Sequence, residues 1–370
     1  MKIFIIVGEM SGDLLGSKFM TAMHDFEFVG IGGEKMEKQG LKSLFNIKEI
    51  NVMGVFEVLP NIFKINNLIK QTISEIEKEQ PDIILTIDSP GFCFRVIKGL
   101  KNCNAKKVHL IAPSVWAWKE KRAKKISKMY DLLLCILPFE PPYFEKHGLS
   151  AKFIGHPIFD DINEDSKQNV YHGDLYNFIL TPGSRKGEVS RIFPIMIEAI
   201  NILKKDYDYD IETNIFATKN TETILKYIAM DESFNCNIVV NADEKTKILK
   251  QANFAIAKSG TNTFEFNIHS VPLVVVYTMN YLTNKLGKLL IKIKFANLVN
   301  IIAGREIIPE FIGDRADSDL IAEKINELLK DGDLTKKQIA ETKDIIKELG
   351  YLNGENAAEK GANEIRKLLQ

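Results

Sequence analysis

Short apolar runs that alternate with amphipathic stretches constrain the fold of this chain most. The first run, residues 2–7, is continuous and β-rich, as is typical of a central parallel strand. Further runs occur at 26–31, 83–87, 108–111, 132–137, 151–154, 178–180, 211–217, 236–240, 254–257 and 273–277. Stretches such as 65–79 and 119–130 have helical periodicity. This alternation predicts an α/β fold with doubly wound sheets and a functional site at the C-terminal ends of strands.

Length and one polar segment indicate two domains. A chain of 370 residues is too long for one ordinary core, and the alternation is interrupted by a polar run at 160–169. We therefore expect a Rossmann-like domain over 1–172 and a second over 173–340, facing each other across a cleft. The charged helical residues 341–370 would pack across the two domains or onto a partner.

Composition excludes several classes of function and predicts a location. Lys plus Arg and Asp plus Glu number 49 each, so the net charge of zero gives no global attraction to nucleic acid. The four cysteines are scattered, as expected of thiols in a reducing compartment. The first apolar run stops at Gly8, too soon for a signal peptide or a membrane span. We expect a cytoplasmic protein.

The segment 257–265 carries the strongest signal for a ligand. It places the turn Ser259-Gly260-Thr261 between an apolar strand and a helix expected over 263–269. The N–H groups and partial positive charge of such a helix start suit a diphosphate, and Glu265 would lie within reach of an attached ribose. An ordinary capped helix, with Ser259 or Thr261 as the cap, is the alternative.

A second turn in the same half of the chain points to the same chemistry. Gly183, Ser184 and Arg185 follow the strand expected over 178–180. Arg185 would reach a phosphate held at the Gly260 turn. A surface turn with a solvated arginine is the alternative interpretation.

Carboxylates at strand ends in the first half are candidates for proton transfer. Asp88 directly follows the run 83–87, where low dielectric would raise its pKa and suit it to deprotonate a hydroxyl. Glu9 and Asp13, after the first strand, are competing bases. For Asp13, a role as an acidic helix cap is at least as good an interpretation.

Two segments suggest contact with lipid or sugar. The loop 112–118 contains both tryptophans and precedes a lysine-rich stretch, and in 281–295 lysines interrupt apolar residues. Anionic headgroups or acyl chains would suit these segments. The alternatives are a loop that plugs a domain edge for 112–118, a solvated helix face for the lysine-rich stretch after it, and a core-facing helix with snorkelling lysines for 281–295.

Together these motifs resemble one family, the lipid-A-disaccharide synthases, which are family 19 glycosyltransferases of the GT-B type. The resemblance is carried by GEMSGD at 8–13, VMGVFEVL at 52–59, IDSP at 87–90, PSVWAW at 113–118, LPFE at 137–140, FIGHP at 153–157, PGSR at 182–185, SGT at 259–261 with Glu265, and NIIAGRE at 300–306. These motifs span nearly the whole chain, and their joint occurrence is highly specific.

The resemblance implies two Rossmann-like domains and an inverting sugar transfer. The reaction would join UDP-2,3-diacylglucosamine to the 6-hydroxyl of 2,3-diacylglucosamine 1-phosphate, giving a β-1,6 disaccharide and UDP. It implies no metal and no cofactor, and peripheral association with the cytoplasmic face of the inner membrane. A homodimer and a monomer both stay open.

The resemblance also assigns residues. Asp88 matches the proposed general base, Glu9 a functionally important glutamate, and Arg185 and Asn300 residues needed for activity. The UDP cradle would comprise Gly183, Ser184, Arg185, Ser259, Gly260, Thr261, Glu265 and Asn300, with Ser11, Asp13 and Trp116 as candidates on the acceptor side.

The chain departs from the family pattern at Gly91, Thr278 and Val299, where an aspartate, a basic residue and a proline are usual. Gly91 removes a second carboxylate from the loop after 83–87. Two rival functions are kept: a UDP-sugar 2-epimerase, which would need no acceptor, and a non-catalytic nucleotide-binding scaffold, which would bind UDP without turnover.

Overall fold

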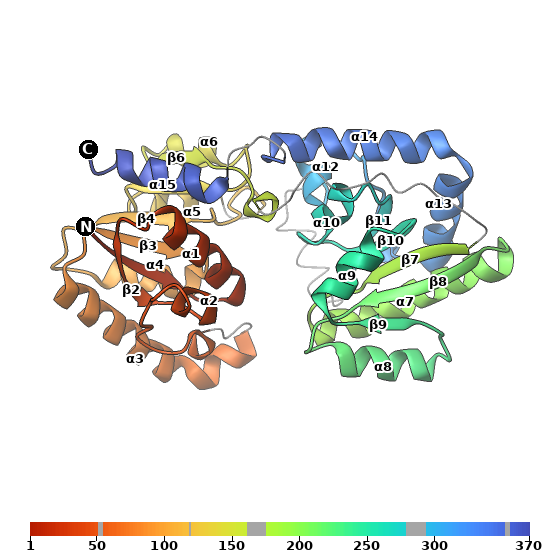
Figure 1. The fold of residues 1–370 in the computed structure, drawn as a ribbon, viewed down its shortest axis with the longest axis horizontal. Helices are drawn as coiled ribbons and strands as arrows, with labels where there is room; N and C mark the ends of the chain where they lie inside the picture. The colour runs from red at the N-terminus through yellow and green to blue at the C-terminus, as the bar shows by residue number, and fades with distance from the viewer. Residues whose placement is uncertain (51–54, 118–119, 161–174, 279–293, 352–355) are drawn as a thin grey trace. The chain divides into compact units, whose positions relative to one another are not determined.

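The chain folds into two compact units in the computed structural model, which describes residues 1–370 except 51–54, 118–119, 161–174, 279–293 and 352–355 (Figure 1). Unit 1 comprises Met1–Ile162 with Leu349–Gln370, and unit 2 comprises Asn163–Glu348. The segment expected to form a separate C-terminal part is thus divided between the units at Leu349. The lysine-interrupted segment 281–295 lies almost wholly outside the described residues.

Unit 1 contains a six-stranded parallel sheet with strand order β2-β1-β3-β4-β5-β6. The strands are β1 (Lys2–Val7), β2 (Glu27–Ile31), β3 (Ile83–Ile87), β4 (Lys106–Leu110), β5 (Leu132–Cys135) and β6 (Ser150–Phe153). The helices are α1 (Met10–Ala22), α2 (Glu34–Glu37), α3 (Val55–Glu79), α4 (Pro90–Gly99), α5 (Arg122–Ile126), α6 (Pro141–Glu145) and α15 (Ala357–Lys367), with short turns η1 (Ile47–Glu49) and η2 (Pro157–Phe159). The helix expected over 119–130 is thus a shorter one.

Unit 2 contains a second six-stranded parallel sheet, ordered β12-β11-β10-β7-β8-β9. Its strands are β7 (Leu175–Thr181), β8 (Asp210–Phe216), β9 (Asn237–Val239), β10 (Phe254–Lys258), β11 (Leu273–Tyr277) and β12 (Glu310–Ile312). Its helices are α7 (Lys186–Asp206), α8 (Glu222–Asp231), α9 (Ala242–Leu249), α10 (Thr263–Ile268), α12 (Leu298–Ala303), α13 (Ser318–Lys330) and α14 (Gly332–Glu348), with the turn η3 (Gly313–Arg315).

Strand order reverses once in each sheet, which confirms the predicted α/β, doubly wound fold class. The reversal falls between β1 and β3 in unit 1 and between β7 and β10 in unit 2. Loops on the two sides of such a switch point diverge and leave a crevice at the carboxyl ends of the strands. The topology therefore marks one candidate position for a site in each unit.

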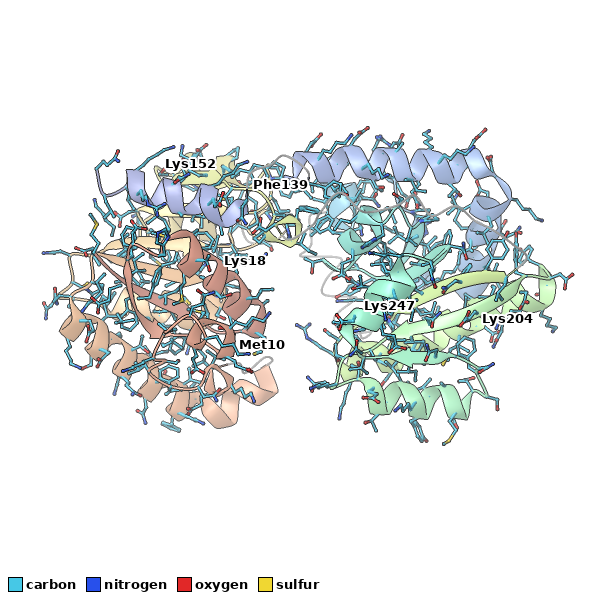
Figure 2. The ribbon with its side chains drawn as sticks, in the orientation of Figure 1. Met10, Lys18, Phe139, Lys152, Lys204 and Lys247 are labelled. Atoms are coloured by element: carbon cyan, nitrogen blue, oxygen red, sulfur yellow. The ribbon has the colours of Figure 1, made fainter. Side chains whose placement is uncertain are left out.

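The central strands are apolar on both faces because helices cover both faces of each sheet. In β1 and β3, Ile3 pairs with Ile83 and Val7 with Ile87, and all four side chains are fully buried. Exposed charged side chains such as Lys152 and Lys247 lie outside this core (Figure 2), while the polar side chains of Thr86 in β3 and His109 in β4 are fully buried.

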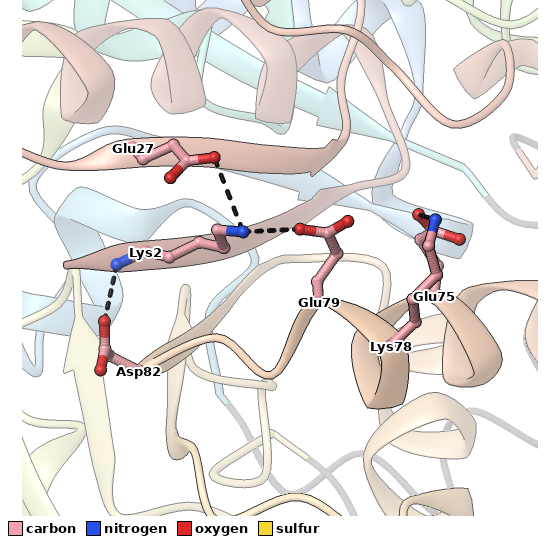
Figure 3. A network of polar contacts seen from close by, with 6 residues as sticks. All are labelled: Lys2, Glu27, Glu75, Lys78, Glu79 and Asp82. Atoms are coloured by element: carbon pink, nitrogen blue, oxygen red, sulfur yellow. Dashed lines mark hydrogen bonds and ion pairs between the residues drawn. The ribbon is translucent and has the colours of Figure 1, made fainter.

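A charged cluster closes the end of the first sheet where β1 begins (Figure 3). Lys2 Nζ lies 2.7 Å from Glu79 Oε2 and 3.6 Å from Glu27 Oε1, and the Lys2 backbone N–H donates to Asp82 Oδ2 at 2.7 Å. These groups are all partly exposed to solvent, which screens their charges, so the cluster contributes little to stability. It lies at the N-terminal edge of the strands, opposite the switch-point crevice.

The C-terminal helix α15 belongs to unit 1 because it packs closely on α1. A β-carbon at Gly361 would lie 2.4 Å from Cζ of Phe19, so only glycine allows this approach. Arg366 Nη2 adds an ion pair with Asp25 Oδ1 at 2.7 Å and a hydrogen bond to the Ala22 carbonyl at 3.0 Å. The chain therefore returns from unit 2 to complete the core of unit 1.

Candidate active site

A pocket of about 430 Å³ lies at the switch point of unit 2. Loops after β7, β8 and β10 and the helices α9 and α10 form its wall. The lining residues are Thr181, Gly183, Ser184, Phe216, Ala217, Thr218, Lys245, Lys258, Ser259, Gly260, Thr261, Asn262, Glu265 and Phe266. The structure thus brings six of the predicted cradle residues together, and Arg185 and Asn300 are not in the wall.

The Gly260 turn is held in place by side chains on both sides. Ser259 Oγ donates to the Ala296 carbonyl at 2.8 Å, and Asn262 Nδ2 donates to Thr181 Oγ1 at 2.9 Å. Within the described part of the chain, the backbone N–H groups of Gly260 and Thr261 have no hydrogen-bond acceptor. Both residues line the pocket, so these donors are available to a ligand there.

Two lysines that sequence reasoning did not single out give the pocket its positive charge. Lys245 Nζ donates to the Ala217 carbonyl at 2.6 Å and lies 5.7 Å from the centre of the Phe216 ring. Burial lowers the pKa of Lys245, and the carboxylate of Glu265 acts in the opposite direction. Lys258 lies at the end of β10, directly before the Gly260 turn. Such cations suit an anionic ligand.

Glu188 links the two phosphate-directed turns. Its Oε1 lies 3.3 Å from Arg185 Nη1 and 3.4 Å from Lys258 Nζ. A β-carbon at Gly183, whose φ is +126°, would lie 2.9 Å from Glu188 Oε2. Glycine at this turn therefore serves both the backbone conformation and the approach of the carboxylate. Arg185 is 64% exposed, so its guanidinium lies near the pocket at its rim.

Glu265 lies in the pocket wall on α10. Desolvation in the pocket raises the pKa of its carboxyl, while the charge of Lys245 lowers it. The two groups thus form an opposite-charge pair in the wall. A carboxylate of this kind accepts hydrogen bonds from sugar hydroxyls.

Asp88 and Glu9 lie at the switch point of unit 1, just after β3 and β1. Asp88 and Ser89 both have left-handed backbones, with φ of 52° and 44°. The backbone N–H of Asp88 donates to the Leu110 carbonyl at 3.0 Å, which holds this strained turn against β4. Burial raises the pKa of Asp88, and the Ser89 backbone N–H acts against that rise. Glu9 precedes α1, directly after β1 and Gly8.

The contacts of Asp13 give it a structural role, because its side chain holds the start of α2. It is fully buried, and its carboxylate accepts from the backbone N–H groups of Gly33 at 2.8 Å, Lys35 at 2.9 Å and Met36 at 3.2 Å. These donors are at the start of α2, so Asp13 caps that helix from α1. Ser11, by contrast, is exposed on the first turn of α1.

Asn300 also turns inward. Its Nδ2 donates to the Ile308 carbonyl and to Glu310 Oε1, both at 2.7 Å, and its Oδ1 accepts from the N–H groups of Ile307 at 2.8 Å and Ile308 at 3.0 Å. The side chain is fully buried. Its amide therefore supports the loop before β12 from inside unit 2.

Trp116 is half-buried and fixed by two neighbours that follow β5. Its Nε1 donates to Glu140 Oε1 at 3.3 Å, and its ring meets Phe139 edge-on at a centroid distance of 5.2 Å. Glu140 is 2% exposed, and burial raises its pKa to about 7. The indole is thus held at the carboxyl-end edge of the sheet that also carries Asp88.

Within the described ranges, no three His, Cys, Asp or Glu side chains are grouped so that they could hold a metal ion. The cations of the unit 2 pocket are its own lysines, with Arg185 at the rim. The arrangement is suited to bind a doubly charged anion through N–H groups and ammonium groups.

Solved structures of known proteins share this fold, and one of them is a structure with UDP. The structure of S. aureus MnaA with UDP matches with a TM-score of 0.64 at 14% identity, covering 100% of this chain and 96% of that one. Acinetobacter baumannii MurG matches with a TM-score of 0.57 at 11% identity, covering 99% of both chains. These likenesses establish the GT-B fold.

The family is shown by sequence. A model described as lipid-A-disaccharide synthetase matches residues 3–364. The lipid-A-disaccharide synthase of Rickettsia bellii (strain OSU 85-389) is 41% identical over 372 residues, covering 95% of this chain and 94% of the relative. That of Rickettsia prowazekii (strain Madrid E) is 40% identical over 368 residues, with the same coverages of 95% and 94%. This chain belongs to the lipid-A-disaccharide synthetase family of glycosyltransferases.

Proposed function

We propose that this enzyme transfers 2,3-diacylglucosamine from its UDP derivative to the 6-hydroxyl of 2,3-diacylglucosamine 1-phosphate, with inversion at the donor carbon. The products are the β-1,6 disaccharide 1-phosphate and UDP. The observation that carries the proposal is the unit 2 pocket, where Lys245, Lys258 and the backbone N–H groups of Gly260 and Thr261 converge. Family membership supports the lipid substrates.

In this proposal the pocket holds the UDP part of the donor. The N–H groups of Gly260 and Thr261 and the ammonium group of Lys258 bind the diphosphate, and Arg185 joins them from the rim. Glu265 accepts hydrogen bonds from the ribose. Fixed positive potential then stabilises the charge that develops on the departing UDP.

Asp88 is proposed to act on the acceptor. It takes the proton of the 6-hydroxyl while that oxygen forms a bond to the donor C1 from the face opposite UDP. The bond between C1 and the diphosphate oxygen breaks, and its electron pair leaves with UDP. Raised pKa suits Asp88 to this step, and Glu9 is the competing base. No oxidation state changes, so no redox cofactor is assigned.

We also propose that the enzyme works as a peripheral protein at the cytoplasmic face of the inner membrane, where acylated substrates lie. Lys121, Lys124, Lys125 and Lys128 are exposed in and around α5, and Phe63 on α3 is 81% exposed. Basic groups and an exposed aromatic ring together suit an anionic lipid surface. No helix in the described ranges is long and apolar enough to cross a membrane.

The test is UDP release from UDP-2,3-diacylglucosamine in detergent with EDTA, with and without the 1-phosphate acceptor. We expect release only with acceptor, and a loss of about a hundredfold or more in Asp88→Asn. Release without acceptor, or turnover of UDP-N-acetylglucosamine alone, would replace the transferase proposal with an epimerase or hydrolase. UDP binding without any turnover would indicate a scaffold.

The Asp88 variant separates the two candidate bases. Full activity in Asp88→Asn together with loss in Glu9→Gln would move the base to Glu9. Each variant should still bind UDP as the wild type does, because neither residue belongs to the unit 2 pocket.

A further inference from the structure

Glu310 is a buried carboxylate at the start of β12, the edge strand of the second sheet, and it has no part in the proposed chemistry. It is 4% exposed. Its Oε2 accepts from the Ala296 N–H at 2.7 Å, and its Oε1 accepts from the Asn297 N–H at 2.9 Å and from Asn300 Nδ2 at 2.7 Å. Glu310 therefore fixes the backbone just before α12 in one position.

That backbone in turn contacts the Gly260 turn at two points. Ser259 Oγ donates to the Ala296 carbonyl at 2.8 Å. Asn297 Nδ2 donates to Thr263 Oγ1 at 3.1 Å, and Thr263 Oγ1 donates to the Gly260 carbonyl at 2.8 Å. The hydrogen bonds thus run without a gap from Glu310 to the turn.

The donor and the acceptor of each hydrogen bond in this network are fixed by the chemistry of the side chains. Thr263 has one hydroxyl proton, which it gives to Gly260, so its oxygen is the acceptor for Asn297. Asn297 Oδ1 accepts from the Val299 N–H at 2.8 Å and so caps α12 at the same time. Both Asn297 and Thr263 are fully buried, where lost hydrogen bonds are not replaced by water.

None of Glu310, Asn297 and Thr263 lines the pocket, yet the turn that they hold supplies the N–H donors of Gly260 and Thr261. A shift of the Gly260 carbonyl rotates the peptide group whose N–H belongs to Thr261. The Gly260 carbonyl accepts from both the Thr263 hydroxyl at 2.8 Å and the Thr263 backbone N–H at 3.2 Å, so the position of one ligand donor depends in part on that hydroxyl.

We propose that Glu310, Asn297 and Thr263 are positioning residues for the donor diphosphate, acting through the Gly260 turn. This rests on the proposed binding of UDP in the unit 2 pocket. It also gives Asn300 a purpose, since Asn300 Nδ2 donates to Glu310 Oε1 at 2.7 Å and so helps to hold that carboxylate.

The test is calorimetric titration of UDP into the wild type, Thr263→Val and Thr263→Ser. Valine keeps the volume and removes the hydroxyl, whereas serine keeps the hydroxyl. We expect Thr263→Val to raise the Kd for UDP about tenfold and Thr263→Ser to stay within about twofold of the wild type. In assays, Thr263→Val should raise the donor KM and leave the acceptor KM unchanged.

Gln338→Leu is the matched control for general loosening of unit 2. Gln338 is also buried, and its amide pairs with the N–H and carbonyl of Leu273 at 2.8 Å and 3.1 Å, at the start of β11 and away from the Gly260 turn. This variant should lower the melting temperature and leave the Kd for UDP unchanged. If Gln338→Leu raised the Kd for UDP as much as Thr263→Val does, the inference would be overturned.

The remaining outcomes separate this inference from the proposed function. If the wild type binds UDP and Thr263→Val binds it equally well, the positioning role falls and the donor pocket stands. If the wild type binds no UDP, the donor pocket falls and the positioning role with it. Glu310→Gln is a second test of the inference. In this variant an amide nitrogen would face the Ala296 N–H in place of a carboxylate oxygen, so we expect a higher donor KM.

Discussion

Gly8 and Ser89 are in contact so close that a β-carbon on residue 8 would lie 2.1 Å from Ser89 Oγ. The loop after β1 therefore rests directly on the loop after β3. Glu9 and Asp88 are the neighbours of these two residues in sequence. The two candidate bases thus depend on one tight contact at the switch point of unit 1.

Gly8→Ala should therefore disturb both candidate bases at once. The added methyl forces the Ser89 turn away, and a misplacement of about 1 Å costs roughly a hundredfold in rate. Strain of this kind also destabilises by about 1–3 kcal/mol. Steady-state kinetics and thermal melting would measure the two effects.

Ser89→Gly supplies the control for that variant. It removes the atoms that collide with the new methyl, and glycine accepts the left-handed backbone of residue 89, whose φ is 44°. The double variant should regain most of the lost activity. A double variant as inactive as Gly8→Ala would mean that the contact itself is not the cause.

The pH dependence of the reaction should reflect the raised pKa of Asp88. A general base acts only when ionised, so activity falls as pH drops through its pKa. Because burial raises that pKa above the ordinary 3.8, the acid limb of kcat/KM should lie above pH 3.8. The residual activity of Asp88→Asn should lack this limb. An unchanged limb in the variant would assign it to another group.

Lys245 and Lys247 lie two residues apart on α9 and offer a matched pair for the charge of the pocket. Lys245 lines the pocket, whereas Lys247 is exposed and lies outside the pocket wall (Figure 2). Lys245→Met should weaken UDP binding about tenfold, with Lys247→Met near the wild type. Equal effects of both variants, vanishing at high salt, would indicate long-range attraction instead of a direct contact.

Most strands could be predicted because a strand buried on both faces is a continuous apolar run. The run 83–87 is β3 to the residue, and 273–277 is β11. β12 was missed because it has three residues and starts with Glu310. The burial of that glutamate depends on partners at 296, 297 and 300, which no local pattern reveals.

Part of the candidate site could likewise be predicted from local sequence, and part of it could not. The Gly260 turn could be predicted because strand, glycine and helix are adjacent in the sequence. Lys258 stands beside that turn and could have been included on the same ground. Lys245 could not, because it lies on a charged helix and reaches the pocket only through the fold. Asn300 was included because it matches a family motif, but a motif does not show in which direction the side-chain amide points. In the structure the amide is buried and contacts the loop before β12.

Replacing Asn300 should lower stability as well as activity. In Asn300→Asp a carboxylate would face Glu310 Oε1, from which the native Nδ2 lies 2.7 Å, and two buried carboxylates would repel each other. We expect a loss of about 2–4 kcal/mol in the free energy of unfolding. Urea denaturation would measure it. Asn300→Asp with Glu310→Gln should recover part of the loss, and a fully stable single variant would contradict the buried contacts.

Glu140 should make stability depend on pH in a defined window. Burial raises its pKa from 4.5 to about 7 in the folded state. Below pH 4.5 the group is protonated in both the folded and unfolded states. Between these two values the unfolded chain ionises first, so the free energy of unfolding falls as pH rises. Above about 7 both states are ionised and the fall ends.

Glu140→Gln isolates this contribution because glutamine does not titrate. Relative to the variant, the wild type should lose about 3 kcal/mol of stability as the pH rises through that window. Urea denaturation of both proteins at several pH values measures the difference directly. Two parallel curves would show that Glu140 ionises equally in both states. The hydrogen bonds that the carboxylate accepts, from the Leu137 N–H at 3.1 Å and from Trp116 Nε1 at 3.3 Å, would then offset the cost of burying its charge.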